Sequence, residues 1–132
     1  MAILIGLTLA AAVSALARGT GLDRDRAFYP TVMIVIAALY TLFAVIGGSP
    51  GALVAEMIVG AGFIALTLAG FKQSLWLVVV ALAAHGVFDI FHPHAIDNRG
   101  VPVWWPEFCS AYDIAAAAIL GWQIHRSKRL AA

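Results

Sequence analysis

Hydrophobic positions along the chain form five long stretches, separated by short breaks that are polar or contain Gly and Pro. The stretches cover residues 2–17, 28–46, 52–70, 74–91 and 106–124. Because a helix needs about 17–25 residues to cross the hydrocarbon core of a bilayer, the last four are long enough and the first is marginal. The pattern predicts an all-α integral membrane protein: a five-helix transmembrane bundle in which residues 1–132 form a single transmembrane domain.

Two of the breaks, at 47–50 and 70–73, are so short that the helices on either side of them should be antiparallel neighbours. The first stretch ends in Ala15, Leu16 and Ala17, which resemble a signal-peptidase site. However, residues 1–6 contain no Lys or Arg to form the basic start of a signal peptide. We therefore expect the first stretch to be kept as a transmembrane helix.

Basic residues predict the orientation of the bundle. With five spans, Arg99 falls on one side of the membrane and all other Lys and Arg residues fall on the opposite side: Arg18, Arg24, Arg26, Lys72, Arg126, Lys128 and Arg129. The positive-inside rule then places the N-terminus outside and the C-terminus in the cytoplasm, as in a bacterial inner-membrane protein. The aromatic belt agrees, because Trp76 and Trp122 fall near the inner boundary and Trp104 and Trp105 near the outer one.

Composition supports a lipid bilayer as the surroundings of the chain. Hydrophobic residues make up 63% of the sequence and charged residues 11%, whereas about 25% of a typical soluble domain is charged. A soluble chain this short could not bury so much apolar surface. The net charge of +1 gives no reason to expect nucleic acid as a partner. With a single cysteine, an internal disulfide and a Cys-x-x-Cys pair are both excluded.

Ligand-type side chains interrupt the fourth stretch. His85, Asp89 and His92 follow one another at spacings of four and three, which places them on one face of a helix, and His94 comes directly after Pro93. Imidazole and carboxylate groups suit zinc or iron, so these three histidines and Asp89 are candidate ligands of a divalent metal. The alternative is a buried Asp–His hydrogen-bonded pair that joins two helices.

Two further acids complete a candidate site in the outer half of the bundle. Glu56 lies just over one turn inside the third stretch and Asp113 two turns inside the fifth. A charged group near a helix centre costs about 2.5–3.5 kcal/mol, so these carboxylates need a proton, a partner or a cation. We expect Glu56, Asp113 and Tyr112 to be catalytic, with Glu56 reaching to the interface as the alternative. Cys109 is more often a packing residue than a ligand in such a setting.

Residues 93–105 form a loop rich in Trp and Pro between the fourth and fifth helices, and we expect it to fold back over this region from outside. The leading hypothesis is a metal-dependent membrane enzyme, a hydrolase or an oxidoreductase, that acts on a lipid or another apolar substrate. A cation- or proton-coupled transporter or sensor is an alternative. However, Thr31 and Thr67 are the only polar side chains that the inner half of the predicted bundle offers for a pathway. The third hypothesis is a structural subunit of a larger membrane complex or a homo-oligomer.

Overall fold

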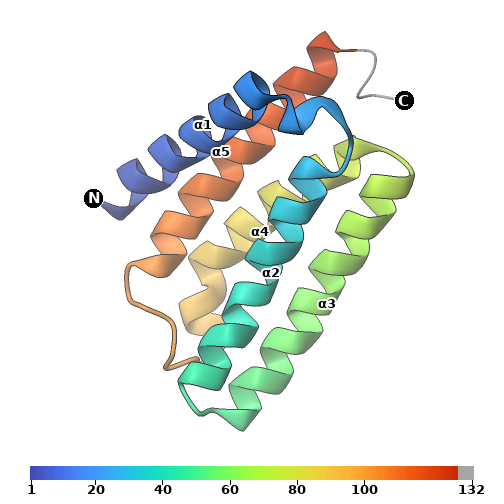
Figure 1. Cartoon of the computed structure of the whole chain (residues 1–132). Coiled ribbons are helices and arrows are strands. Elements are labelled where there is room, and N and C mark those ends of the chain that lie inside the picture. The colour runs from blue at the N-terminus through green and yellow to red at the C-terminus, as the bar shows by residue number, and fades with distance from the viewer. Residues whose placement is uncertain (128–132) are drawn as a thin grey trace.

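The computed structural model describes residues 1–127, and within them the chain is helical without any strand (Figure 1). The helices are α1 (Ala2–Thr20), α2 (Phe28–Ile46), α3 (Pro50–Lys72), α4 (Leu75–Ala95) and α5 (Trp105–Arg126), with a short 3₁₀ helix, η1 (Leu22–Arg24), between α1 and α2. The prediction of an all-α protein with five long helices is confirmed.

The helix boundaries follow from local side-chain chemistry. Ser49 caps α3 by accepting a hydrogen bond from the amide of Ala52, and Pro50 occupies the first turn, where no backbone donor is needed. Ser74 caps α4 in a similar way. Gly21 ends α1 at a φ of 83°, a left-handed conformation that glycine adopts without strain. The connections are therefore short and well defined, which sets neighbouring helices close together.

Four helices of the described chain, α1 to α4, are long and apolar enough to cross a membrane, which indicates a multi-pass membrane protein. The first helix has 19 residues and meets this criterion, although its apolar stretch is marginal in the sequence. The fifth helix has the length of a span, with 22 residues, but it carries Glu107, Asp113 and Gln123 and is less apolar. Its role as a fifth span stays a prediction.

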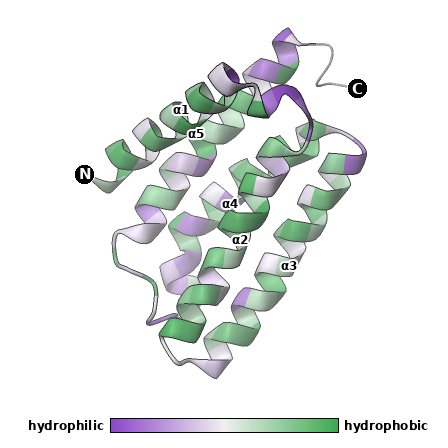
Figure 2. Ribbon diagram, viewed as in Figure 1, coloured by the Kyte–Doolittle hydropathy of each residue, from purple (hydrophilic) through white to green (hydrophobic). Residues whose placement is uncertain are grey.

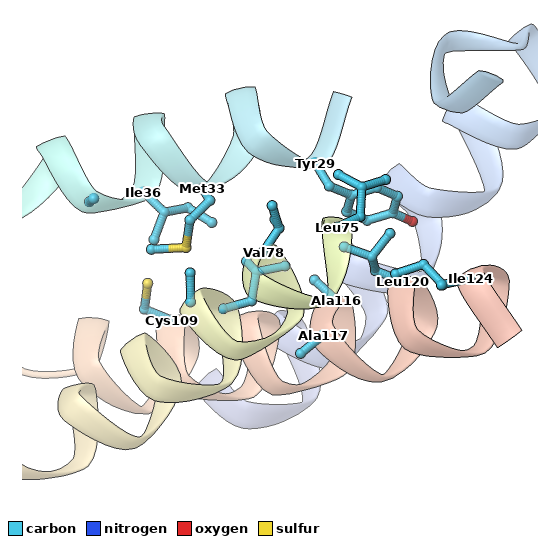
Figure 3. Close-up of a cluster of buried hydrophobic side chains, with 13 residues drawn as sticks. Tyr29, Met33, Ile36, Leu75, Val78, Cys109, Ala116, Ala117, Leu120 and Ile124 are labelled. Carbon is cyan, nitrogen blue, oxygen red and sulfur yellow. The ribbon is translucent and has the colours of Figure 1, made fainter. Parts of the chain in front are cut away.

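The helices pack in an order that differs from their order in the chain. As the sequence predicts, α2 packs against α3 and α3 against α4, while α5 packs between α4 and α1 (Figure 1). A buried apolar core fills the space between α2, α4 and α5 (Figure 3). Its largest fully buried members are Met33, Leu82, Leu120 and Val78.

Hydrophobic residues make up most of the helical ribbon in Figure 2. Large apolar side chains such as Ile58 and Val45 are more than half exposed, which is the pattern of helices that contact lipid. One end of the bundle, which we call the basic end, holds η1 and the described residues Arg18, Arg24, Arg26, Lys72 and Arg126. The opposite end, the site end, holds Arg99. Lys128 and Arg129, which also entered the orientation argument, lie outside the described residues.

Candidate functional site

His85 on α4 faces an acid on the neighbouring helix. Its Nδ1 atom lies 2.7 Å from Oδ2 of Asp113 on α5 and 3.5 Å from Oδ2 of Asp89, one turn further along α4. All three side chains are at most 2% exposed. The close approach of α4 and α5 depends on Gly86, because a Cβ atom there would come within 3.1 Å of the Ser110 carbonyl oxygen.

Cys109 adds a sulfur atom to this group. It lies one turn before Asp113 on α5, with its Sγ atom 3.9 Å from Oδ2 of Asp113. His85, Asp89, Cys109 and Asp113 each offer one ligand atom, and these atoms all lie within 4.8 Å of one another. We refer to these four buried residues as the four-residue cluster. Cys109 therefore joins the candidate ligands, whereas the sequence favours a packing role for it.

The chemistry of the four-residue cluster fits a divalent cation. Among the described residues, Asp89 Oδ2 and Asp113 Oδ1 are buried without a hydrogen-bond partner, although buried carboxylate oxygens are normally satisfied. Two ionised carboxylates beside a single imidazole leave a negative charge even when His85 is protonated, and an uncompensated buried charge is costly. Nitrogen, oxygen and sulfur donors together suit zinc, and they also occur in iron sites.

Tyr40 on α2 connects the four-residue cluster to a second polar group. Its hydroxyl donates a hydrogen bond of 2.7 Å to Oδ1 of Asp89. Its ring stacks on the imidazole of His92, with ring centroids 3.9 Å apart and planes at 18°. No periodic pattern of polar residues in the sequence indicates Tyr40, because it lies within an apolar stretch. A hydroxyl group deep inside an apolar stretch is the feature by which Tyr40 could be recognised from the sequence.

The second polar group, which we call the outer group, consists of Glu56 on α3, His92 on α4 and Asn98 in the loop. His92 Nε2 lies 2.7 Å from Glu56 Oε1, and the Asn98 side-chain amide donates to the same oxygen at 2.9 Å. The amide also donates to the Tyr40 carbonyl oxygen at 3.0 Å. Glu56 is only 2% exposed, so the alternative in which it reaches to the interface is wrong.

The structure divides the predicted metal ligands between different places. His85 and Asp89 belong to the four-residue cluster, whereas His92 pairs with Glu56 in the outer group. His94 is exposed near the end of α4 and belongs to neither group. Two residues along a helix correspond to a rotation of about 200°, so His94 faces away from His92.

The predicted catalytic residues are divided too. Asp113 lies in the four-residue cluster and Glu56 in the outer group, but Tyr112 is half-buried among apolar side chains. Together with Leu9 and Val13 of α1 it lines a separate cavity of about 210 Å³. Tyr112 and Asp113 point in different directions, because one helical residue turns a side chain by about 100°, and a catalytic role of Tyr112 stays a prediction.

The segment at 96–104 folds back on the bundle, as expected for a loop rich in Trp and Pro. The helix α4 continues through Pro93 to Ala95, so the loop begins later than the predicted 93–105. Asn98 is buried, and Gly100 packs so tightly against the Phe43 carbonyl group and the Gly47 amide that a Cβ atom there would clash with both. The loop thereby covers the outer group.

Two cavities open near these groups at the site end. One, of about 440 Å³, lies between α1, α4, α5 and the loop, and Asp89, Glu107 and Ser110 are the polar residues in its lining. The other, of about 270 Å³, is lined by His92 and Asn98 among others. Both polar groups are therefore next to a space in which a small molecule fits.

Toward the basic end, the apolar core separates the four-residue cluster from a third set of polar side chains. Figure 3 shows Val78 between Cys109 toward one end of the view and Tyr29, with Leu120 beside it, toward the other. The Tyr29 hydroxyl donates a hydrogen bond of 3.3 Å to Ser14 Oγ, and Gln123 is buried. The hydrophobic pattern of the sequence does not indicate a third polar set made of Ser14, Tyr29 and Gln123.

Comparisons of the chain with protein-family models, with curated protein sequences and with solved structures give no match.

Proposed function

We propose that this protein is a metal-dependent enzyme of the membrane that acts on a lipid or another apolar molecule. The observation that carries the proposal is the four-residue cluster, in which two buried carboxylate oxygens lack partners and a thiol and an imidazole lie within reach. The apolar outer faces of the helices support a bilayer as its surroundings. The charge distribution supports a site in the outer leaflet of a bacterial inner membrane.

In this proposal, the ion is zinc or iron, and its ligands are His85, Asp89, Cys109 and Asp113. A bound zinc ion supplies Lewis acidity, which lowers the pKa of a coordinated water to about 7. Tyr40 holds one oxygen of Asp89 through its hydroxyl group and leaves the other oxygen free to act as a ligand. The role of Tyr40 is therefore to position Asp89.

The outer group supplies an acid–base pair. His92 lines the cavity of about 270 Å³, and Glu56 holds its Nε2 atom. A carboxylate that orients an imidazole in this way favours proton transfer to or from a molecule in the cavity. Glu56 in turn is fixed by Asn98 from the loop. We assign His92 as the group that exchanges the proton and Glu56 as the residue that orients it.

An enzyme explains the geometry better than a transporter does. A cation in transit needs polar steps through the whole bundle, but the apolar core separates the four-residue cluster from Ser14, Tyr29 and Gln123. A structural subunit needs no cavity beside its buried acids, whereas Asp89 lines a cavity of about 440 Å³. Both cavities beside the polar groups lie at the site end of the bundle.

The metal content of the purified protein tests this proposal. We expect about one zinc or iron ion per chain, and we expect Asp113→Asn to lower the occupancy at least about tenfold, because it removes an anionic ligand while keeping the shape of the side chain. His94→Ala is the matched control, since His94 is an exposed histidine on the same helix as His85. It should leave the metal content unchanged.

Cobalt substitution keeps the test independent of folding. A cobalt-loaded protein should show absorption from sulfur-to-cobalt charge transfer, and Cys109→Ser should lose this band while retaining the helical circular dichroism spectrum. A folded wild-type protein that binds neither zinc, iron nor cobalt would refute the metal site. So would equal metal content in the wild type and Asp113→Asn.

A further inference from the structure

The cavity of about 440 Å³ is lined by residues of α1, α4, α5 and the loop, and two of them lie on the outer surface of the bundle. Its lining includes Ile3 from α1 and Ile90 from α4, which are 50% and 57% exposed on the apolar outer surface. In the proposed membrane placement these two side chains face lipid. An amphiphilic molecule could therefore enter from the bilayer without first passing through water.

The polar part of the lining carries negative charge and hydrogen-bond acceptors. Asp89 and Glu107 contribute carboxylates and Ser110 a hydroxyl group, while no Lys or Arg side chain within residues 1–127 lines the cavity. Asp89 is fully buried, and its Oδ2 atom has no hydrogen-bond partner among the described residues. This arrangement disfavours an anionic head group, since like charges repel each other.

The N-terminal turn of α5 is the one feature of the cavity that attracts anions. Pro106 and Glu107 lie in this turn, where free backbone amides and the helix dipole favour negative charge. Glu107 supplies that negative charge itself, and Pro106 has no amide hydrogen to donate. The negative charge at this turn is therefore that of Glu107, and Asp89 is the second carboxylate of the lining.

We propose that this cavity admits an amphiphile with an apolar chain and an uncharged or cationic head that donates hydrogen bonds, such as an amine or a hydroxyl group. The head would lie against Glu107 and Ser110, beside the proposed metal ligand Asp89, and the chain would leave between Ile3 and Ile90 toward the bilayer. The inference rests on the proposed function, because it names the substrate class of the same site. It excludes lipids whose head is a phosphate or a carboxylate alone.

Photoaffinity labelling of the full-length protein in lipid nanodiscs tests this inference. The probes are tetradecylamine, tetradecanol and tetradecyl phosphate, each with a diazirine in the chain. We expect the amine and the alcohol to label peptides that contain Ile90 or Ile3 at least about tenfold more than the phosphate does, corresponding to about 1.4 kcal/mol. Labelling that is equal for the three probes, or strongest with the phosphate, would overturn the inference.

A matched pair of substitutions locates the binding. Ile90→Trp fills the mouth of the cavity, whereas Val87→Trp places the same bulk one turn away on α4, at an exposed position outside the lining. We expect only Ile90→Trp to abolish labelling by the amine. Glu107→Gln should reduce the preference for the amine over the phosphate, since it removes one of the two charges. Equal loss in both tryptophan variants would contradict the assignment.

Competition identifies the source of the head group. Unlabelled diacylglycerol that reduces labelling would assign a membrane lipid with a hydroxyl head, and competition by tetradecylamine alone would assign a free single-chain amine. Metal content measured on the same samples separates this inference from the proposed function. If a metal-free protein is still labelled selectively by the amine, the binding site is supported and the metal-dependent enzyme is refuted. If a metal-loaded protein is labelled without selectivity, the metal site is supported and the binding site is refuted.

Discussion

Asn98 joins three parts of the molecule through one side-chain amide. From the loop at 96–104 it donates hydrogen bonds to Glu56 on α3 and to the backbone carbonyl of Tyr40 on α2. Its side-chain oxygen accepts a hydrogen bond of 3.2 Å from the amide of Gly100, which fixes the turn of the loop. A single polar residue thus determines how the loop covers the outer group.

Replacing Asn98 should therefore loosen the loop. We expect Asn98→Ala to lower the free energy of unfolding by about 1–3 kcal/mol, because the buried acceptors on Glu56 and Tyr40 each lose the hydrogen bond from Asn98. Asn98→Asp should lower the free energy of unfolding further, since it places a second carboxylate next to that of Glu56. Unfolding in mixed micelles with increasing denaturing detergent measures both. Asp97→Ala, at the exposed neighbouring position, is the control, and an equal loss of stability there would contradict this role.

At the scale of helices, α1 is held mainly by α5, its neighbour in space but not in the chain. The contact depends on Gly6, which is buried against the Phe108 carbonyl group and Ala111 of α5. A side chain at this position would overlap the backbone of α5, and backbone cannot move aside as a flexible side chain can. The first helix therefore packs through a small residue, as membrane helices commonly do.

We expect Gly6→Ala to destabilise the protein by about 1–3 kcal/mol, because the added methyl group forces α1 away from α5. The same denaturing-detergent titration measures the change. Gly62→Ala on α3 is the matched control, since a Cβ atom there meets nothing within 4 Å. It should be neutral or slightly stabilising, as alanine favours helix over glycine. No loss of stability in Gly6→Ala would show that α1 does not depend on this contact.

The helices could be predicted from the sequence because the lengths of apolar stretches and the breaks between them depend on local chemistry. The pairing of His85 with Asp89 could also be predicted, since a spacing of four residues determines which side chains share a helical face. Tyr40 and Asn98 could not, because their partners lie 49 and 42 residues away and only tertiary packing brings them together. His94 and Tyr112 have side chains suited to a ligand or an acid, but their positions along the helix turn these side chains away from the four-residue cluster and the outer group.

At the scale of the whole molecule, charge and polarity are distributed along the long axis of the bundle. The described basic residues other than Arg99 lie at the basic end, and both polar groups lie toward the site end. The positive-inside rule then predicts that the loop at 96–104 is outside the cytoplasm. The same orientation places the cavity of about 440 Å³ in the outer leaflet.

Labelling of introduced cysteines with a membrane-impermeant maleimide tests this orientation. In intact cells we expect Arg99→Cys to react and Lys72→Cys to react only after lysis, because both positions are exposed but lie at opposite ends of the bundle. The wild-type chain is the control, since Cys109 is buried and should stay unlabelled in the folded protein. The reverse pattern would invert the predicted topology.

The apolar core between the site and the basic end blocks the movement of protons through the bundle. Met33, Leu82 and Leu120 offer no group that could pass a proton along. A proton taken up at the site must therefore leave on the side from which it came, and no charge crosses the electric field of the bilayer during turnover. The proposed reaction would be electrically silent: collapsing the membrane potential should leave its rate unchanged.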